Sequence, residues 1–177
     1  DEMSWAIDAG PDCHVTATTQ ACEKVYKASA GTAAVSTRIS VASGARVDWL
    51  PQETIVFEGA RLKRRTVAEV VEGGSLLACE MVVLGRGASG ERFTAGLLLD
   101  AWSVRRPGRL VWTDTLRVEG ETPDGAGFGA ANALATVIGV WDAPQVHFEK
   151  ARSLLDAADE VRAGVTVVNG ILVARLL

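Results

Sequence analysis

Two acidic residues lie within segments that otherwise resemble apolar β-strands. Side chains alternate along residues 110–118, and Asp114 falls on the apolar face of that segment. Residues 76–84 are apolar on both faces and include Glu80. A buried carboxylate is costly unless it is paired, hydrogen-bonded, hydrated or protonated. Either these acids form structural ion pairs with arginines, or they line an enclosed polar cavity or cation route.

Paired carboxylates also occur in glycoside hydrolases, so a hydrolase that uses Glu80 and Asp114 is an alternative. The rest of the sequence gives this alternative little support. It contains no G-x-S-x-G motif and no P-loop. Its two histidines, His14 and His147, lie in no recognisable catalytic frame. A hydrolase therefore stays open only as a minor alternative.

Three cysteines and a histidine are the residues with affinity for soft metal ions. Cys13 and His14 are adjacent, so in a strand they point to opposite faces, and Cys22 is distant in sequence. No C-x-x-C spacing of a structural zinc site occurs. We expect Cys13, Cys22 and Cys79 to be small buried side chains. Their small, odd number favours a reducing compartment, so we expect a cytoplasmic protein.

Basic residues gather in two places, at 61–65 and at 105–109. Such groups fit a partner-binding surface or, equally, a strand edge protected by its charge. The candidate partner-binding residues are Arg61, Lys63, Arg64, Arg105 and Arg106.

The overall composition is that of a globular protein with a hydrophobic core. Of the 177 residues, 48% are hydrophobic and 23% are charged, and the net charge is −4. A net-acidic chain is a poor general binder of nucleic acid. No apolar run approaches the roughly 18 residues that a membrane span needs. We expect one domain over residues 1–177 that binds neither nucleic acid nor membrane.

Two-residue alternation dominates the first two-thirds of the chain and predicts short strands separated by turns. The predicted strands cover residues 13–17, 35–41, 47–49, 55–57, 67–71, 75–84, 97–104 and 110–118. So many short strands at near-regular spacing predict a mainly β fold. Its strands would stack as in a β-helix or solenoid, or as in a sandwich.

The last third is less regular and predicts one or two α-helices. Residues 133–141 fit either a strand or an Ala-rich helix. Apolar residues recur at helical spacing over 144–164, which predicts a helix there. Residues 165–177 predict a β-hairpin around the turn Asn169-Gly170.

Four segments carry motifs more specific than alternation. In chain order they are T-T-Q-A-C-E-K-V-Y at 18–26, W-L-P-Q-E-T-I-V-F at 49–57, L-G-R-G-A-S-G-E at 84–91, and D-A-W-S-V-R at 100–105 with G-R-L and Asp114 following. Together they resemble the urease accessory protein D family, UreD, which is called UreH in some organisms.

The resemblance implies a non-catalytic, β-rich scaffold with a couple of helices that serves the nickel-dependent maturation of urease. It implies a nickel metallochaperone component that binds accessory protein F, which recruits the GTPase accessory protein G, and that docks on apo-urease. It also implies an internal tunnel for nickel. No cofactor would be tightly bound, and Ni²⁺ would be present only transiently.

The resemblance and the inward-facing acids together indicate a nickel route lined by Asp1, Glu23, Glu80 and Asp114. Glu80 and Asp114 come from strand alternation, whereas Asp1 and Glu23 are acids within or beside the matched segments. Oxygen ligands hold nickel less tightly than His or Cys clusters, and a conduit must release its ion. A β-rich protein-binding module without a metal role is the alternative.

The chain also departs from the family pattern at its two ends. Members carry an N-terminal section that ends in G-G-x-x-G-G-D, and this sequence starts at an aspartate, Asp1, in that place. Members also continue beyond a strand like the one at 165–177. We therefore expect a UreD-like domain truncated at both ends, with unpaired strand edges where the missing strands belong.

Overall fold

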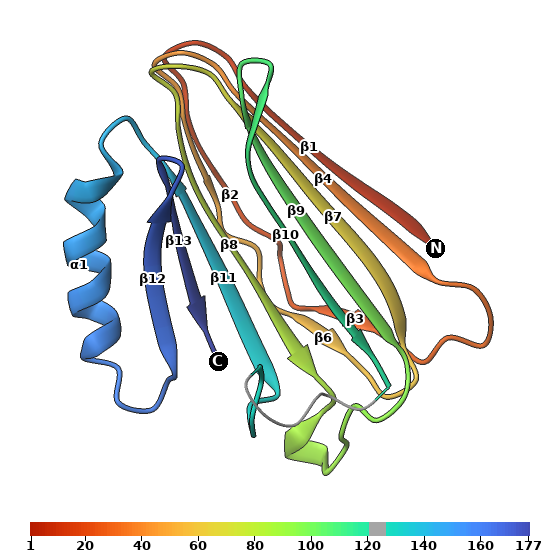
Figure 1. Ribbon diagram of the computed structural model, residues 1–177. Helices are drawn as coiled ribbons and strands as arrows, with labels where there is room; N and C mark the ends of the chain where they lie inside the picture. The colour runs from red at the N-terminus through yellow and green to blue at the C-terminus, as the bar shows by residue number, and fades with distance from the viewer. Residues whose placement is uncertain (121–126) are drawn as a thin grey trace.

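Alternating apolar residues fold the chain into two β-sheets that face each other across a shared core. The computed structural model describes residues 1–120 and 127–177 (Figure 1). We call the five-stranded sheet, with its strands in the order β1-β4-β7-β9-β10, sheet A. Its strands are β1 (Glu2–Ala9), β4 (Ala33–Val41), β7 (Arg61–Val70), β9 (Leu97–Arg106) and β10 (Arg109–Glu119). The first four run parallel, and β10 is antiparallel to β9.

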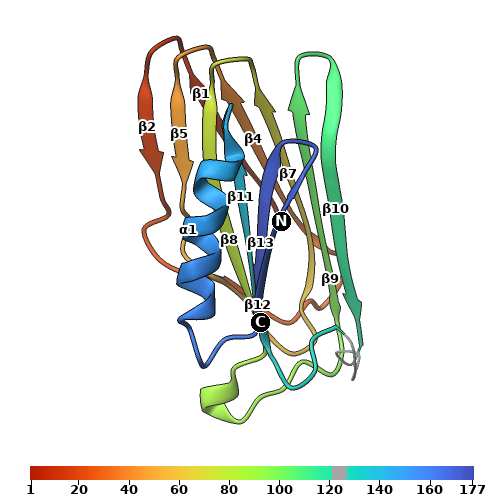
Figure 2. The same cartoon turned by 60° about the vertical axis from the view of Figure 1, so that its left-hand side comes forward.

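The eight-stranded sheet, which we call sheet B, has the main order β12-β13-β11-β8-β5-β2. These strands are β12 (Ala163–Val168), β13 (Ile171–Leu176), β11 (Ala133–Val140), β8 (Ser75–Leu84), β5 (Arg46–Trp49) and β2 (His14–Ala17). Two short strands complete it, because β3 (Glu23–Val25) pairs with β6 (Thr54–Val56), and β6 pairs with β8. Figure 2 shows that the strand axes of the two sheets are roughly aligned, although neighbouring strands can point in opposite directions.

The first part of the chain stacks in the manner of a solenoid. The segments β1–β3, β4–β6 and β7–β8 each pass from sheet A to sheet B, and each pairs in parallel with the next. The corners stack as well, since the Gly44 N–H donates to the Gly73 carbonyl at 3.1 Å. The prediction of a mainly β, solenoid-like stack is confirmed.

The interior contains two hydrophobic clusters rather than one continuous core. One includes Ile39, Val47 and Leu76, and the other includes Leu62 and Leu98. In sheet A, the residues between these clusters on the inward face are polar, because the alternation of β7 and β9 brings charged and hydroxyl side chains inward there. The core is therefore divided by a polar band.

The C-terminal third contains one α-helix, as expected, and a short 3₁₀ turn at Gly87–Ser89 precedes it in the chain. Residues 133–140 form a strand, β11, which settles the ambiguity there. The helix, α1 (Pro144–Asp156), packs on β12 and β13 and ends well before the predicted 164. From Ala163 onward the chain pairs with β13, so the end of the predicted helix is a strand instead. The predicted hairpin is confirmed as β12 and β13, joined at Asn169-Gly170.

The cysteine prediction was wrong. Cys13 is exposed in the turn before β2, while Cys22 and Cys79 are half-buried. The alternation pattern could not predict the exposure of Cys13, because β2 is a short strand at the edge of sheet B. Over the ranges 1–120 and 127–177, no helix has the length and apolar character needed to cross a bilayer.

Candidate functional site

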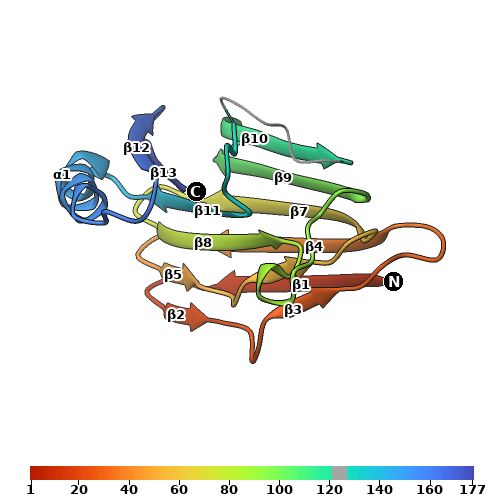
Figure 3. The ribbon, with the colours of Figure 1, turned by 90° about the horizontal axis from the view of Figure 1, so that it is seen from below.

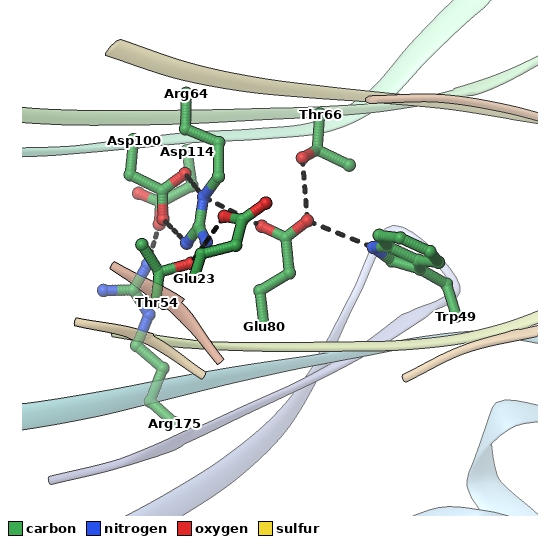
Figure 4. A network of polar contacts seen from close by, with 9 residues as sticks. All are labelled: Glu23, Trp49, Thr54, Arg64, Thr66, Glu80, Asp100, Asp114 and Arg175. Atoms are coloured by element: carbon green, nitrogen blue, oxygen red, sulfur yellow. Dashed lines mark hydrogen bonds and ion pairs between the residues drawn. The ribbon is translucent and has the colours of Figure 1, made fainter. Parts of the chain in front are cut away.

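A band of polar side chains crosses the interior between the two hydrophobic clusters, and we call it the polar layer (Figure 4). Strands of both sheets contribute to it. Its members are Glu23, Trp49, Thr54, Arg64, Thr66, Glu80, Asp100, Asp114 and Arg175.

Arg64 on β7 is the cation at the centre of the polar layer, and only 5% of its side chain is exposed. Its Nε and Nη2 donate to the two carboxylate oxygens of Asp100 at 3.0 and 2.7 Å. Its Nη1 donates to Thr54 Oγ1 at 3.2 Å. Burial would lower the pKa of Arg64, but the nearby carboxylates of Glu80 and Asp100 raise it above its ordinary value. The guanidinium therefore stays charged inside the protein.

Glu80 on β8 faces Arg64 from the opposite sheet. Its Oε1 accepts hydrogen bonds from Trp49 Nε1 at 3.2 Å and from Thr66 Oγ1 at 3.0 Å. Its Oε2 lies 3.2 Å from Arg64 Nε but accepts no aligned hydrogen bond from any described residue. Burial raises the pKa of Glu80 above its ordinary value, against the opposing effect of Arg64. Glu80 is thus a buried acid with one oxygen incompletely satisfied.

Asp114 lies at the end of the polar layer formed by β10. It forms an ion pair with Arg175 of β13, and 32% of its side chain is exposed. The prediction that Asp114 faces the interior holds, but the residue is half-buried rather than enclosed. Both acids singled out by alternation therefore have arginine partners, as the ion-pair interpretation required.

Glu23 and Asp1 lie toward the other end of the polar layer. Glu23 Oε2 accepts a hydrogen bond from Thr54 Oγ1 at 3.1 Å. A cavity of about 20 Å³ is lined by Trp5, Glu23 and Glu80, among other residues, which is space for about one water molecule. Glu23 also lines a neighbouring surface groove of about 870 Å³, and so does the exposed Asp1. The structure thus brings Asp1, Glu23 and Glu80 into adjoining spaces and places Asp114 on β10, at the far edge of sheet A.

This arrangement is not a preformed metal centre. Among residues 1–120 and 127–177, no three His, Cys, Asp or Glu side chains gather closely enough to hold a metal ion. A cation that reached Glu80 would also meet the charged Arg64, which repels it. The space beside Glu80 is too small for a sugar, so the glycosidase alternative finds no substrate site there.

Sequence reasoning missed Arg64 and Asp100, although the necessary signal was present. Asp100 alternates with Leu98 and Trp102, the same pattern that revealed Glu80. Arg64 was assigned to a surface patch, and that prediction was wrong. Its neighbours Lys63 and Arg65 point outward, so a period of two necessarily turns Arg64 inward.

The other basic candidates do not form a single patch either. Arg61 and Lys63 point outward from β7, whereas Arg105 is exposed at the far end of β9. Arg106 is half-buried, donates to the Trp141 carbonyl at 3.3 Å and lies 3.7 Å from Asp142. The alternative of a charged strand edge is wrong for β7, because β7 is the middle strand of sheet A.

A family model described as UreD urease accessory protein matches residues 1–177. The chain is similar to the urease accessory protein UreD of Rhizobium johnstonii, with 44% identity over 99% of the chain and 65% of that protein. It is 43% identical to UreD 2 of Methylorubrum populi, over 99% of the chain and 60% of that protein. It is 41% identical to UreD of Agrobacterium fabrum, over 99% of the chain and 62% of that protein. The chain thus spans less than two-thirds of the length of these curated relatives.

Proposed function

Because the chain belongs to the UreD family of urease accessory proteins, we propose that it acts as a scaffold in the nickel-dependent maturation of urease. In this role it bridges apo-urease to accessory proteins F and G in the cytoplasm. It performs no catalysis of its own. Nickel is its cargo and is bound only transiently.

The polar layer supplies the route that we propose for this cargo. A cation enters the surface groove beside Asp1 and Glu23, passes the carboxylate of Glu80 and leaves near Asp114. The observation that carries the proposal is Glu80 Oε2, which is buried beside a water-sized cavity and accepts no aligned hydrogen bond within the described ranges. A buried carboxylate oxygen of this kind has capacity left for a cation or a water molecule.

Weak binding of nickel suits a protein that must pass the ion on. The acids along the route offer only oxygen ligands, which bind nickel less tightly than imidazole or thiolate. Arg64 lies among them and disfavours a resident dication. An ion would therefore pass through without being trapped.

A protein-binding module without a metal role is the second candidate, and a specific observation favours it. Glu80 and Asp114 each contact an arginine, so both can be explained as structural ion pairs. The two candidates differ in whether these acids matter to nickel delivery when the protein remains folded and bound to its partners.

The test is complementation of a urease-positive host that lacks its own member of the family. The host receives this sequence, extended to the length of the relatives, as wild type or as Glu80→Gln, Asp114→Asn or Glu149→Gln. Glu149 is exposed on α1 and serves as the matched control. Urease activity, urease-bound nickel and recovery of the accessory complex are measured together.

We expect Glu80→Gln and Asp114→Asn to lower urease-bound nickel while the accessory complex still assembles, with Glu149→Gln behaving as wild type. Unchanged nickel in both variants would refute the route and leave the scaffold role. Failure of the wild type to restore urease would refute the accessory role itself.

A further inference from the structure

The outer face of sheet A carries a row of three cations on its middle strand. Arg61, Lys63 and Arg65 occupy alternate positions of β7 and point away from the core, and we call them the cationic row. Successive members are about 7 Å apart along the strand. Lys63 and Arg65 are exposed, and Arg61 is half-buried. Figure 3 shows β7 between β4 and β9, far from either edge of the sheet.

No acid lies across from the cationic row on the neighbouring strands. Lys63 pairs in register with Ala34 on β4 and Leu99 on β9. Arg65 pairs with Ser36 and Ala101 in the same way. Among the residues that the structure describes, no carboxylate lies within ion-pair distance of any member of the row. Their mutual repulsion is therefore not offset by an ion pair.

Other cations on the same face lie beside acidic residues. Arg38 forms two hydrogen bonds with the Asp8 carboxylate, at 2.7 and 3.0 Å. Arg105 is in register with Glu69 on the adjacent strand. The cationic row is thus an exception on a face that elsewhere places acids beside its bases.

Protection against edge-to-edge pairing does not explain the row. Proteins use lysine for that purpose on edge strands, and β7 has hydrogen-bonded neighbours on both sides. Solubility does not require three adjacent like charges either, since scattered charges serve it as well.

The side chains around the row leave a hollow in this face. Its floor includes the small residues Ala34, Ser36 and Ala101, and the row members Lys63 and Arg65 also line it. Glu2 of β1 lines its far side, two strands away from β7. Its volume is about 670 Å³. In the described part of the chain no helix covers this face, since α1 packs on β12 and β13 of the other sheet (Figure 1). An extended segment can lie on the small side chains and reach the cations with its own carboxylates.

We propose that the outer face of sheet A, centred on the cationic row, docks an acidic segment of a partner protein. This inference goes beyond the proposed function and does not depend on a nickel route. A nucleic acid is the less suitable occupant, because the row offers only three cations, whereas proteins that bind nucleic acid contact many phosphates.

The test uses a fluorescein-labelled deca-glutamate peptide and fluorescence anisotropy at low and high salt. A deca-glutamine peptide and a labelled single-stranded DNA are the comparison probes. The double variant K63S/R65S removes two members of the row. The double variant R38S/R117S removes two cations of the same face that already have acidic partners, Asp8 and Glu119, and is the matched control.

We expect the wild type to bind deca-glutamate in a salt-sensitive manner, and K63S/R65S to weaken that binding about tenfold, the loss of two exposed ion pairs. R38S/R117S should bind as the wild type does. Equal binding by both double variants, or no binding at low salt, would overturn the proposal. Tighter binding of DNA than of deca-glutamate would overturn the assignment of a protein partner. The assay contains neither urease nor nickel, so its failure leaves the proposed function standing.

Discussion

Arg64 Nε lies 3.2 Å from Glu80 Oε2, and this contact joins the two sheets through the middle of the core. Arg64 belongs to β7 of sheet A and Glu80 to β8 of sheet B. The same guanidinium holds both carboxylate oxygens of Asp100. One buried cation therefore serves two buried acids, and its removal would leave both without compensation.

The first prediction follows directly from that relationship. Replacing Arg64 with Met keeps much of its volume but leaves Glu80 and Asp100 buried without a cation. We expect the free energy of unfolding to fall by about 3–5 kcal/mol, the usual cost of breaking a buried ion pair from one side. Urea denaturation followed by tryptophan fluorescence measures this.

Arg65→Met is the matched control for Arg64→Met, because the two residues are adjacent and point to opposite faces. We expect the control to change the free energy of unfolding by less than about 0.5 kcal/mol. Equal effects of the two substitutions would show that the polar layer is not held by Arg64.

The second prediction concerns pH and Asp48. This residue is buried on β5, where Oδ2 contacts His14 Nε2 and Oδ1 accepts from Arg46 Nε, each at 3.0 Å. Burial raises the pKa of Asp48, but the hydrogen bonds from His14 and Arg46 outweigh it and the net shift is downward. The folded pKa thus lies below the unfolded value of about 3.9. Asp48 contributes stability above that value and loses it as the pH falls through the folded pKa.

Asp48→Asn should therefore be less stable than the wild type near neutral pH. The difference in the free energy of unfolding should shrink as the pH falls from about 5 to about 2. Asp156→Asn, at an exposed helix position, is the control and should show a small difference at every pH. If the difference in the free energy of unfolding between Asp48→Asn and the wild type stayed constant over this pH range, the lowered pKa of Asp48 would be contradicted.

Much of the fold was predictable, because a period of two reports directly which face a side chain occupies. The same pattern placed Glu80 inside and Asp114 toward the interior. It could not identify their partners. Glu80 meets Arg64 from the other sheet, and Asp114 meets Arg175 of the closing hairpin, so each pair depends on how the strands are distributed between sheets.

The errors have physical causes of the same kind. Arg64 was assigned to the surface because basic residues surround it, although alternation within β7 turns it inward. The predicted helix continued to 164 because apolar residues keep helical spacing beyond Asp156. Pairing of the following residues with β13 overrides that local preference.

The third prediction uses the cysteines as probes of burial. Cys13 is exposed, whereas Cys79 is half-buried on β8. Burial and, secondarily, the neighbouring Glu80 raise the pKa of the Cys79 thiol. Less thiolate and poorer access both slow its reactions. Two double variants isolate the thiols: Cys22→Ser with Cys13→Ser retains only Cys79, and Cys22→Ser with Cys79→Ser retains only Cys13. We therefore expect Cys79 to react slowly and Cys13 to react fast with a chromogenic disulfide reagent. The reverse order would contradict the structure of β8.

The last prediction concerns the entry to β9, the strand that carries Asp100. Gly96 has a φ of 130°, and a Cβ there would collide with the Ala60 carbonyl oxygen and lie 2.9 Å from the Phe93 ring. Since Ala60 also accepts the Leu97 N–H at 2.9 Å, relief of the collision would displace the start of β9. We expect Gly96→Ala to lower the free energy of unfolding by about 3 kcal/mol or more.

Gly108, in the turn between β9 and β10, provides the comparison for Gly96. Its φ of 68° also favours glycine, but a Cβ there meets no described atom within 4 Å. Gly108→Ala should therefore cost only the backbone preference, about 1 kcal/mol. Thermal and urea denaturation of both variants measure the difference. Equal losses would mean that the contact with Ala60 does not fix the position of β9, and the alignment of Asp100 with Arg64 would then need another cause.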